Sequence, residues 1–310
     1  MYLCCLYTSH FIYLQVKFRE MEKIMEKSKS KINKVSLNFK RYLCNEIDWK
    51  TRLIGIKGAR GTGKTTLMLQ RLKSDYHNSN IAVYISMDDI YFSANSMAGF
   101  ADDFVKNGGK FLFIDEVHKY PGWSKELKNI YDDHQELSIA FTSSSALEIY
   151  KGEADLSRRA IVYDLNELSL REYIELMHNV KIPSISLSDI LTKQDEISSH
   201  INQLIKPIAF FNEYNRYGAY PFIAERKTKY YERLQTIVNM IIENDLPSIV
   251  KIEYQTILKI KKLLYILAGI VPYKPNIAEL SRKIGTSRDL LSKYLELLDK
   301  ANLIKQLHSD

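Results

Sequence analysis

The sequence predicts an α/β fold in which helices cover both faces of a parallel sheet, with a helical region after it. Five short apolar segments between residues 53 and 165 alternate with helical patterns, which is typical of strands buried on both faces. From residue 201 onward the apolar spacing is that of helices. A chain of 310 residues has room for about two domains, each with a sizeable core.

Composition and charge narrow the class of protein. Hydrophobic residues make up 45% and charged residues 26% of the chain, as in an ordinary soluble globular protein. The three cysteines form neither a disulfide framework nor a metal-ligand pattern, which favours the cytoplasm. The net charge is +7, with ten Lys and Arg against five Asp and Glu in residues 17–50 and eleven against six in residues 251–310. This excess of positive charge suggests that the chain binds a nucleic acid or an acidic partner. The alternative is that these charges lie on solvated helix faces.

The first 34 residues predict an N-terminal extension. Residues 1–16 are apolar and uncharged, but they are too short to span a bilayer comfortably and lack the basic start of a signal peptide. We therefore expect no transmembrane segment. One interpretation of this segment is an upstream start codon, with Met21 as the natural start, and the alternative is a membrane-surface anchor. Residues 19–34 are rich in Lys, Glu and Ser and predict a solvated helix or arm.

The strongest motif follows the first predicted strand, residues 53–56. Residues 58–65 read GARGTGKT and fit the phosphate-binding loop G-x-x-x-x-G-K-[ST], with a helix predicted from residue 66. Glycines let the backbone N–H groups turn toward a phosphate chain, and the helix directs its positive dipole end to the same place. Lys64 is expected to reach the β- and γ-phosphates of ATP, and Thr65 to bind Mg²⁺. The expected nucleotide-binding residues are Gly58, Ala59, Arg60, Gly61, Thr62, Gly63, Lys64, Thr65 and Thr66.

A pair of acids ends the third predicted strand, residues 111–114. Asp115 is expected to join Thr65 in the Mg²⁺ shell, and Glu116 to orient and polarise a water molecule that attacks the γ-phosphate. The alternative is an exposed acidic pair that closes the strand. Asp88 and Asp89 follow the second strand, residues 81–85, and predict a helix cap or, alternatively, groups near the metal.

The fourth and fifth predicted strands are residues 138–142 and 160–165. Ligands of such sheets bind at the carboxyl ends of the strands, where the loop, the acids and a Thr-Ser-Ser run at 142–144 all fall. We choose Ser143 from this run as a hydroxyl that contacts the γ-phosphate or positions water; a loop held by serine hydrogen bonds is the alternative.

Residues 35–50 predict a helix beside the sheet, where Trp49 borders the adenine or packs in the core.

Three stretches resemble the prokaryotic AAA+-type ATPases of the AAA_14 group. They read GARGTGKTTLMLQ, FLFIDEVHKYPGWSKELKNIYDDH and FTSSSALEIYKGEADLSRRAIVYDLNELSLREYIEL, and Arg60 and the run at 118–123 are the specific marks. The resemblance implies an ATPase in which Ser143 acts as a sensor. It also implies that Arg158 or Arg159, of which we choose Arg159, is an arginine finger that reaches a neighbouring copy; a surface ion pair is the alternative. Members commonly carry a nuclease-like DUF4143 domain, which would start about where this chain stops.

The second half of the chain predicts helices over residues 168–177, 201–216, 227–245 and 250–269. Ser169 and Glu172 form a capping-box pattern, whereas the polar residues 180–200 predict a linker.

Residues 277–284 and 288–301, separated by a Gly-Thr-Ser turn, have helix-turn-helix spacing, and residues 302–305 predict the start of a β-wing. Residues 277–305 would thus bind DNA through Ser287, Arg288, Ser292 and Lys293, or contact a protein target.

These observations predict a P-loop NTPase with a helical lid and a C-terminal winged-helix-like domain. The expected domains are an N-terminal arm (1–34), an AAA+-like ATPase domain (35–180), a helical region (181–265) and the winged-helix-like domain (266–310). The leading functional prediction is an ATPase that uses ATP and Mg²⁺ to drive a conformational change, acting on DNA or a protein and assembling as a homo-oligomer. A slow nucleotide-dependent switch is the first alternative, and a small-molecule or nucleotide kinase the second.

Overall fold

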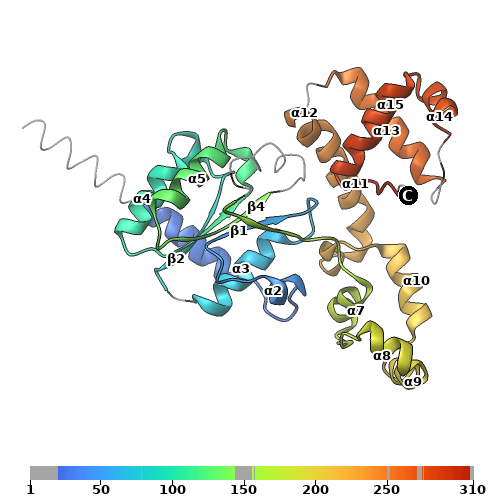
Figure 1. Cartoon of the computed structure of the whole chain (residues 1–310), viewed down its shortest axis with the longest axis horizontal. Helices are drawn as coiled ribbons and strands as arrows, with labels where there is room; N and C mark the ends of the chain where they lie inside the picture. Colours follow the sequence, from blue (N-terminus) through green and yellow to red (C-terminus); the bar gives the residue numbers. More distant parts are fainter. Residues whose placement is uncertain are drawn as a thin grey trace, which may run out of the picture. The chain divides into compact units, whose positions relative to one another are not determined.

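The computed structural model describes residues 20–77, 79–143, 156, 158–249, 252–270, 274 and 276–307. These residues form two compact units, which Figure 1 shows in the colours of the sequence. The first unit runs to Lys57, resumes at Gly63 and ends at Leu165. The second takes Gly58–Thr62 and the chain from Asn166 onward. The predictions made for residues 1–16 and for Ser144 lie outside the described residues.

The first unit contains one parallel sheet of five strands in the order β2-β3-β4-β1-β5. The predicted parallel sheet is therefore confirmed, and each of the five apolar segments is a strand whose ends differ from the prediction by at most one residue. The strands are β1 (Leu53–Lys57), β2 (Ala82–Ser86), β3 (Phe111–Asp115), β4 (Ser138–Ser143) and β5 (Ile161–Asp164).

Helices cover both faces of this sheet, as the sequence predicts. Alternate side chains of the buried strands enter two separate cores, so that Val83 and Ile85 lie in one and Tyr84 in the other. The helices α4 (Met97–Lys106) and α5 (Trp123–Asp133) supply residues to the first core. The second core contains Leu67 and Leu72 of α3 (Lys64–Asp75). Strands buried on both faces explain why these segments read as continuous apolar runs.

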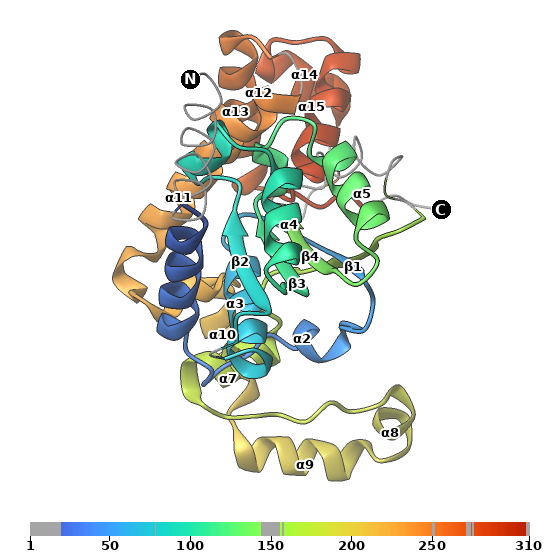
Figure 2. The ribbon, with the colours of Figure 1, turned by 90° about the vertical axis from the view of Figure 1, so that its left-hand side faces the viewer.

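Residues 20–34 form a helix, but the prediction of a solvated arm is wrong for one of its faces. Ile24, Ser28 and Ile32 are buried, at four-residue spacing that places them on one side of the helix. Figure 2 shows this helix beside β2, the strand at one edge of the sheet. The Lys and Glu residues that suggested a solvated segment lie mostly on the opposite, exposed side.

The helix predicted over residues 35–50 is also largely wrong, because only α2 (Leu43–Glu46) is helical there. The carbonyl groups of Ser36 and Phe39 accept hydrogen bonds from the Gln70 side chain of α3, at 2.8 and 2.7 Å. Side-chain donors on α3 thus satisfy backbone groups that a helix would pair internally. The segment lies along α3 and does not form the regular hydrogen bonds of a helix of its own.

The second unit begins with α7 (Leu170–His178), where both hydrogen bonds of the predicted capping box between Ser169 and Glu172 are present. The linker predicted at 180–200 is wrong, because α8 (Leu187–Thr192) and most of α9 (Gln194–Leu204) lie within it. Ser186, which suggested a loop, accepts the N–H of Asp189 and caps α8. The single helix predicted over residues 201–216 is two, because Pro207 cannot continue α9 and begins α10 (Pro207–Tyr217).

The rest of the second unit is helical. A short 3₁₀ helix (Pro221–Ala224) precedes α11 (Tyr230–Met240), which continues into a π-helical turn (Ile241–Asp245) and α12 (Leu246–Ile249). The last three helices, α13 (Tyr254–Ala268), α14 (Ile277–Ile284) and α15 (Arg288–Lys300), share one apolar core. The predicted helix-turn-helix pair is confirmed. Residues 302–307 contain turns and no strand, so the described residues show no β-wing. Among the helices the structure describes, none is long and apolar enough to cross a membrane.

Candidate nucleotide-binding site

The loop between β1 and α3 has the backbone that its glycines permit. Gly61 and Gly63 have φ angles of +90° and +96°, a region that L-residues with side chains rarely adopt. Gly63 caps α3, whose first residue is Lys64. The first N–H groups of a helix have no partners within it, so they are free to bind an anion. Lys64 is 5% exposed, and Thr65 and the exposed Thr66 follow it on α3.

Arg60, in the middle of the loop, contacts the end of the π-helical turn. Its guanidinium donates from Nε and Nη2 to the two carboxylate oxygens of Asp245, at 3.4 and 3.1 Å. A Cβ placed on the next residue, Gly61, would lie 3.1 Å from side-chain atoms of both Ile237 and Phe222. Only a glycine therefore fits here without displacing its neighbours.

Asp115, at the end of β3, accepts hydrogen bonds from three hydroxyl groups. Thr65 Oγ1, of the other residue predicted to bind the metal ion, donates to its Oδ2 at 2.7 Å. The Tyr84 hydroxyl donates to the same oxygen at 2.7 Å, and Thr142 Oγ1 donates to Oδ1. Asp115 is 3% exposed. Burial, with the nearby Asp115 charge as the second cause, raises the pKa of Tyr84 well above its usual value, so Tyr84 keeps its proton.

The side-chain oxygens of Thr65 and Asp115 suit Mg²⁺. The Thr65 hydroxyl and the Asp115 carboxylate are oxygen ligands, which this ion prefers, and they are within hydrogen-bond distance of each other. Among the described residues, no group of three or more His, Cys, Asp or Glu side chains is placed to hold a metal. Mg²⁺ in nucleotide sites commonly takes its remaining ligands from phosphate and water, so the two residues fit such a site.

Glu116 lies directly after Asp115 in a backbone conformation that is uncommon for its residue type. Its φ is 56° and its ψ is 41°, in the left-handed region. Its N–H donates to Thr142 Oγ1 at 3.0 Å, and its Oε2 lies 3.5 Å from Nε2 of His118. A non-glycine residue in the left-handed region costs free energy, so surrounding contacts must hold it there. Such residues occur often at functional sites. Thr142 therefore positions both acids, and sequence reasoning missed it by choosing its neighbour Ser143.

Ser143 and Arg159 differ in their surroundings. Ser143 is fully buried in β4 opposite Lys57, the last residue of β1, and its Oγ has no hydrogen-bond partner among the described residues. Arg159 donates from Nε and Nη2 to the two carboxylate oxygens of Asp132, at 2.9 and 3.0 Å. The hydrogen bond from Arg159 lowers the pKa of Asp132. This contact is the ion pair that was the alternative for Arg159, and the finger role stays a prediction.

Three further predicted residues have structural contacts. The Asp89 side chain accepts the N–H of Tyr91 and caps a 3₁₀ helix (Ile90–Ser93), while Asp88 pairs with Lys119 at 2.6 Å. The indole N–H of Trp49 donates to the carbonyl of Cys44 at 3.0 Å, and its ring packs near Phe113. The contacts of Trp49 agree with the packing interpretation.

Two family models match parts of the chain. Residues 50–174 match AAA_14, described as an AAA domain. This match covers the sheet, the loop and both acids, and it supports nucleotide binding by the chain. Residues 208–309 match DUF8612, a domain of unknown function, and the association with DUF4143 that the resemblance implies is not shown.

Individual proteins are also similar to the chain. The uncharacterized protein MJ1637 of Methanocaldococcus jannaschii is 28% identical over 284 residues, which is 86% of this chain and 58% of that protein. Among solved structures, the Walker-type ATPase paby2304 of Pyrococcus abyssi has a TM-score of 0.46 and 14% identity, over 92% of this chain and 91% of that one. AMPPCP-bound DnaA from Aquifex aeolicus has a TM-score of 0.32 and 17% identity, over 84% and 86% of the two chains. These structural likenesses are too remote to bear on function.

Proposed function

We propose that the chain is a Mg²⁺-dependent ATPase of AAA+ type. The observation that carries the proposal is the 2.7 Å hydrogen bond between Thr65 and Asp115. It joins Thr65, at the start of the helix after a phosphate-binding loop, to the acid at the end of β3, which β4 separates from β1. This arrangement is the one in which P-loop enzymes hold the metal ion of a nucleotide.

Each residue of the site has a role in this proposal. The loop N–H groups and Lys64 bind the phosphates, and Thr65 and Asp115 hold the metal. When bound, Mg²⁺ neutralises the negative charge that develops on the phosphate oxygens. Glu116, which His118 contacts at 3.5 Å, orients the attacking water and accepts its proton. The buried Ser143 hydroxyl supplies a donor near the end of β1.

Two variants test the roles of Lys64 and Glu116. Lys64→Ala is expected to weaken ATP binding, because the loop loses its ammonium group. Glu116→Gln is expected to bind ATP as the parent does but to stop turnover, because an amide keeps the shape of the side chain and cannot act as a base. Turnover by Glu116→Gln at the parent's rate would exclude Glu116 as the catalytic base. Unchanged ATP affinity in Lys64→Ala would refute the assignment of the loop.

The helix-turn-helix pair supports a macromolecular target, DNA or a protein. Ser287 caps α15, and Arg288, Ser292 and Lys293 are exposed on its first two turns. A DNA target predicts that the double variant Arg288→Ala, Lys293→Ala loses DNA affinity at fixed salt. The salt slope of binding should fall by about one for each lost phosphate contact, while the ATPase rate without DNA stays at the parent's value. No DNA binding by the parent at low salt would leave a protein as the target.

A homo-oligomer is the remaining proposed partner, because an arginine finger acts on the nucleotide of a neighbouring copy. Turnover per chain should then rise with protein concentration, and Arg159→Ala should abolish the rise. A monomer by light scattering with a flat concentration dependence would refute the finger.

A further inference from the structure

The Tyr84 side chain links the edge of the sheet to the candidate metal site. Tyr84 is 4% exposed, and its hydroxyl donates to Asp115 Oδ2 at 2.7 Å. It comes from the edge strand β2, whose neighbour β3 carries Asp115. A buried phenol needs a hydrogen-bond partner, and this one has a carboxylate, so the contact is a strong charge-assisted bond.

The contact matters for the orientation of the carboxylate. Thr142 donates to Oδ1, whereas Thr65 and Tyr84 both donate to Oδ2. Thr65 is itself a candidate metal ligand, so its hydroxyl would serve the ion as well as Asp115. Tyr84 is the donor to Oδ2 that has no such second role. Together with Thr142 on the other oxygen, it fixes the rotation of the carboxylate plane.

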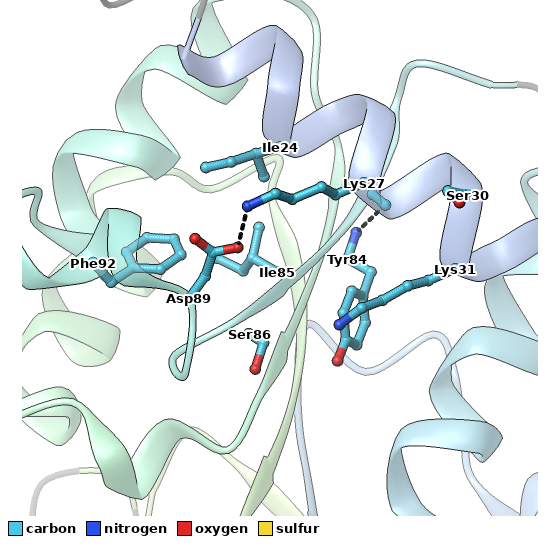
Figure 3. Close-up of a pocket in the computed structure, with 10 residues that line it drawn as sticks. Ile24, Lys27, Ser30, Lys31, Tyr84, Ile85, Ser86, Asp89 and Phe92 are labelled. Carbon is cyan, nitrogen blue, oxygen red and sulfur yellow. Dashed lines mark hydrogen bonds and ion pairs between the residues drawn. The ribbon is translucent and has the colours of Figure 1, made fainter.

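The helix over residues 20–34 holds Tyr84 in turn. Ser28, which is 3% exposed, accepts the backbone N–H of Tyr84 at 2.9 Å. The ammonium of Lys31 lies 4.7 Å from the centre of the Tyr84 ring, a cation–π contact. Lys27 pairs at 2.8 Å with Asp89, in the loop that follows β2. Figure 3 shows the pair of Lys27 and Asp89, and Lys31 beside the Tyr84 ring, around a cavity between the helix and β2.

The same helix is anchored on both faces of the sheet. Ile24 is part of the core on one face of the sheet, and Ile32 is part of the core on the other. The helix therefore lies alongside β2 and covers this edge of the sheet (Figure 2). An edge strand has one row of backbone groups without a neighbouring strand, and here Ser28 satisfies one of them. Anchoring on two cores gives the helix a fixed place from which to hold Tyr84.

We propose that Tyr84 is a positioning residue that orients Asp115 for the metal ion, and that the helix over residues 20–34 holds Tyr84 in place for this role. The inference rests on the proposed Mg²⁺-dependent nucleotide site. Residues far ahead of the phosphate-binding loop thereby set how tightly the site binds its metal.

Metal-linked nucleotide affinity tests this role. Binding of a non-hydrolysable ATP analogue is measured by calorimetry in EDTA and across a series of Mg²⁺ concentrations, and binding of Mn²⁺ by electron paramagnetic resonance. The variants are Tyr84→Phe, which removes only the hydroxyl, and Ser28→Ala, which removes the acceptor of the Tyr84 N–H. The matched control is Tyr131→Phe, on α5, where the contact with Arg52 involves the ring and the backbone carbonyl.

In Tyr84→Phe, the gain in affinity on adding Mg²⁺ should fall about tenfold, the size expected for one hydrogen bond to a charged group. Affinity in EDTA should stay within about twofold of the parent, because the phosphate loop is untouched, and Mn²⁺ should bind more weakly. Ser28→Ala should change the same quantities in the same direction by about threefold, and Tyr131→Phe should change neither.

Three results would overturn the inference. An equal Mg²⁺ gain in the parent and Tyr84→Phe would show that Asp115 does not need the hydroxyl. An equal loss in EDTA and in Mg²⁺ would show that Tyr84 supports the fold of the loop instead of the metal. A parent that binds the analogue without any Mg²⁺ gain would refute both the inference and the proposed function, whereas the first two results leave the proposed function intact.

Discussion

The substitution Thr142→Val removes a hydroxyl that serves both acids while keeping the shape of the side chain. Thr142 is fully buried, and its Oγ1 donates to Asp115 and accepts the Glu116 N–H at 3.0 Å. A hydrogen bond to a charged group contributes about 1.5–3 kcal/mol, and a buried N–H left without a partner costs about 1–3 kcal/mol. Because the two effects share one atom and are not fully additive, we expect a loss of about 3 kcal/mol in the free energy of unfolding.

Urea unfolding followed by tryptophan fluorescence measures this loss. The two tryptophans of the chain, Trp49 and Trp123, contribute to the two cores of the first unit, so the signal reports on that unit. With a slope of about 2 kcal/mol per M, the unfolding midpoint should fall by about 1.5 M. Thr142→Ser is the matched control, because it keeps the hydroxyl and loses one buried methyl group, at a cost of about 1 kcal/mol. If the valine variant is as stable as the serine variant, the hydroxyl does not hold the two acids.

Two further predictions concern the second unit. Arg60→Ala and Asp245→Ala should each destabilise this unit. Because the two side chains are only 22% and 16% exposed, a double-mutant cycle in thermal unfolding should give a coupling energy of about 1 kcal/mol. Additive losses would show that the contact contributes nothing to stability. The hydrogen bond from Lys227, at 2.7 Å, lowers the pKa of Glu213 below its ordinary value of 4.5. A carboxylate whose pKa is lowered by folding stabilises the protein above its unfolded pKa and loses that contribution as the pH falls through the lower folded pKa. The free energy of unfolding should therefore decline as the pH falls below about 4.5. Glu213→Gln should flatten this decline in thermal melts followed by circular dichroism. An equal decline in both proteins would exclude Glu213 as a source of the pH dependence.

Much of the fold could be predicted because its signals are local. The strands are short apolar runs, and the phosphate loop is one uninterrupted motif between a strand and a helix. Capping is also local, so the capping box at Ser169 and Glu172 was found from four residues. The helix-turn-helix pair was found in the same way, from the apolar spacing of two helices around Gly285.

Two of the errors arose where polar composition hid a helix. Ile24 and Ile32 repeat at helical spacing on either side of Ser28, but the surrounding Lys and Glu made the segment read as solvated. In residues 180–200, serines that suggested a loop include Ser186, which caps a helix. In the first segment the periodicity of the apolar residues was a better guide than the overall polarity, and in the second the guide was the capping position of Ser186.

The supporting contacts of the site could not be predicted, because they depend on how distant strands and helices align. Tyr84 is 31 residues from Asp115, Thr142 is 27 residues from it, and Asp245 is 185 residues from Arg60. The sequence placed Asp115 and a Thr-Ser-Ser run at the same edge of the sheet. Only the register of β3 and β4 decides that Thr142, and not Ser143, faces the carboxylate.

The most direct test of the central claim is the Mg²⁺ dependence of ATP binding in Thr65→Val. This variant removes the hydroxyl that lies 2.7 Å from Asp115 and keeps the shape of the side chain. The matched control is Thr236→Val on α11, whose hydroxyl donates to the carbonyl of Glu232. We predict that Mg²⁺ strengthens ATP binding by the parent and by Thr236→Val, but has little effect on Thr65→Val, while all three bind ATP equally in EDTA. An undiminished Mg²⁺ effect in Thr65→Val would contradict the shared metal site of Thr65 and Asp115.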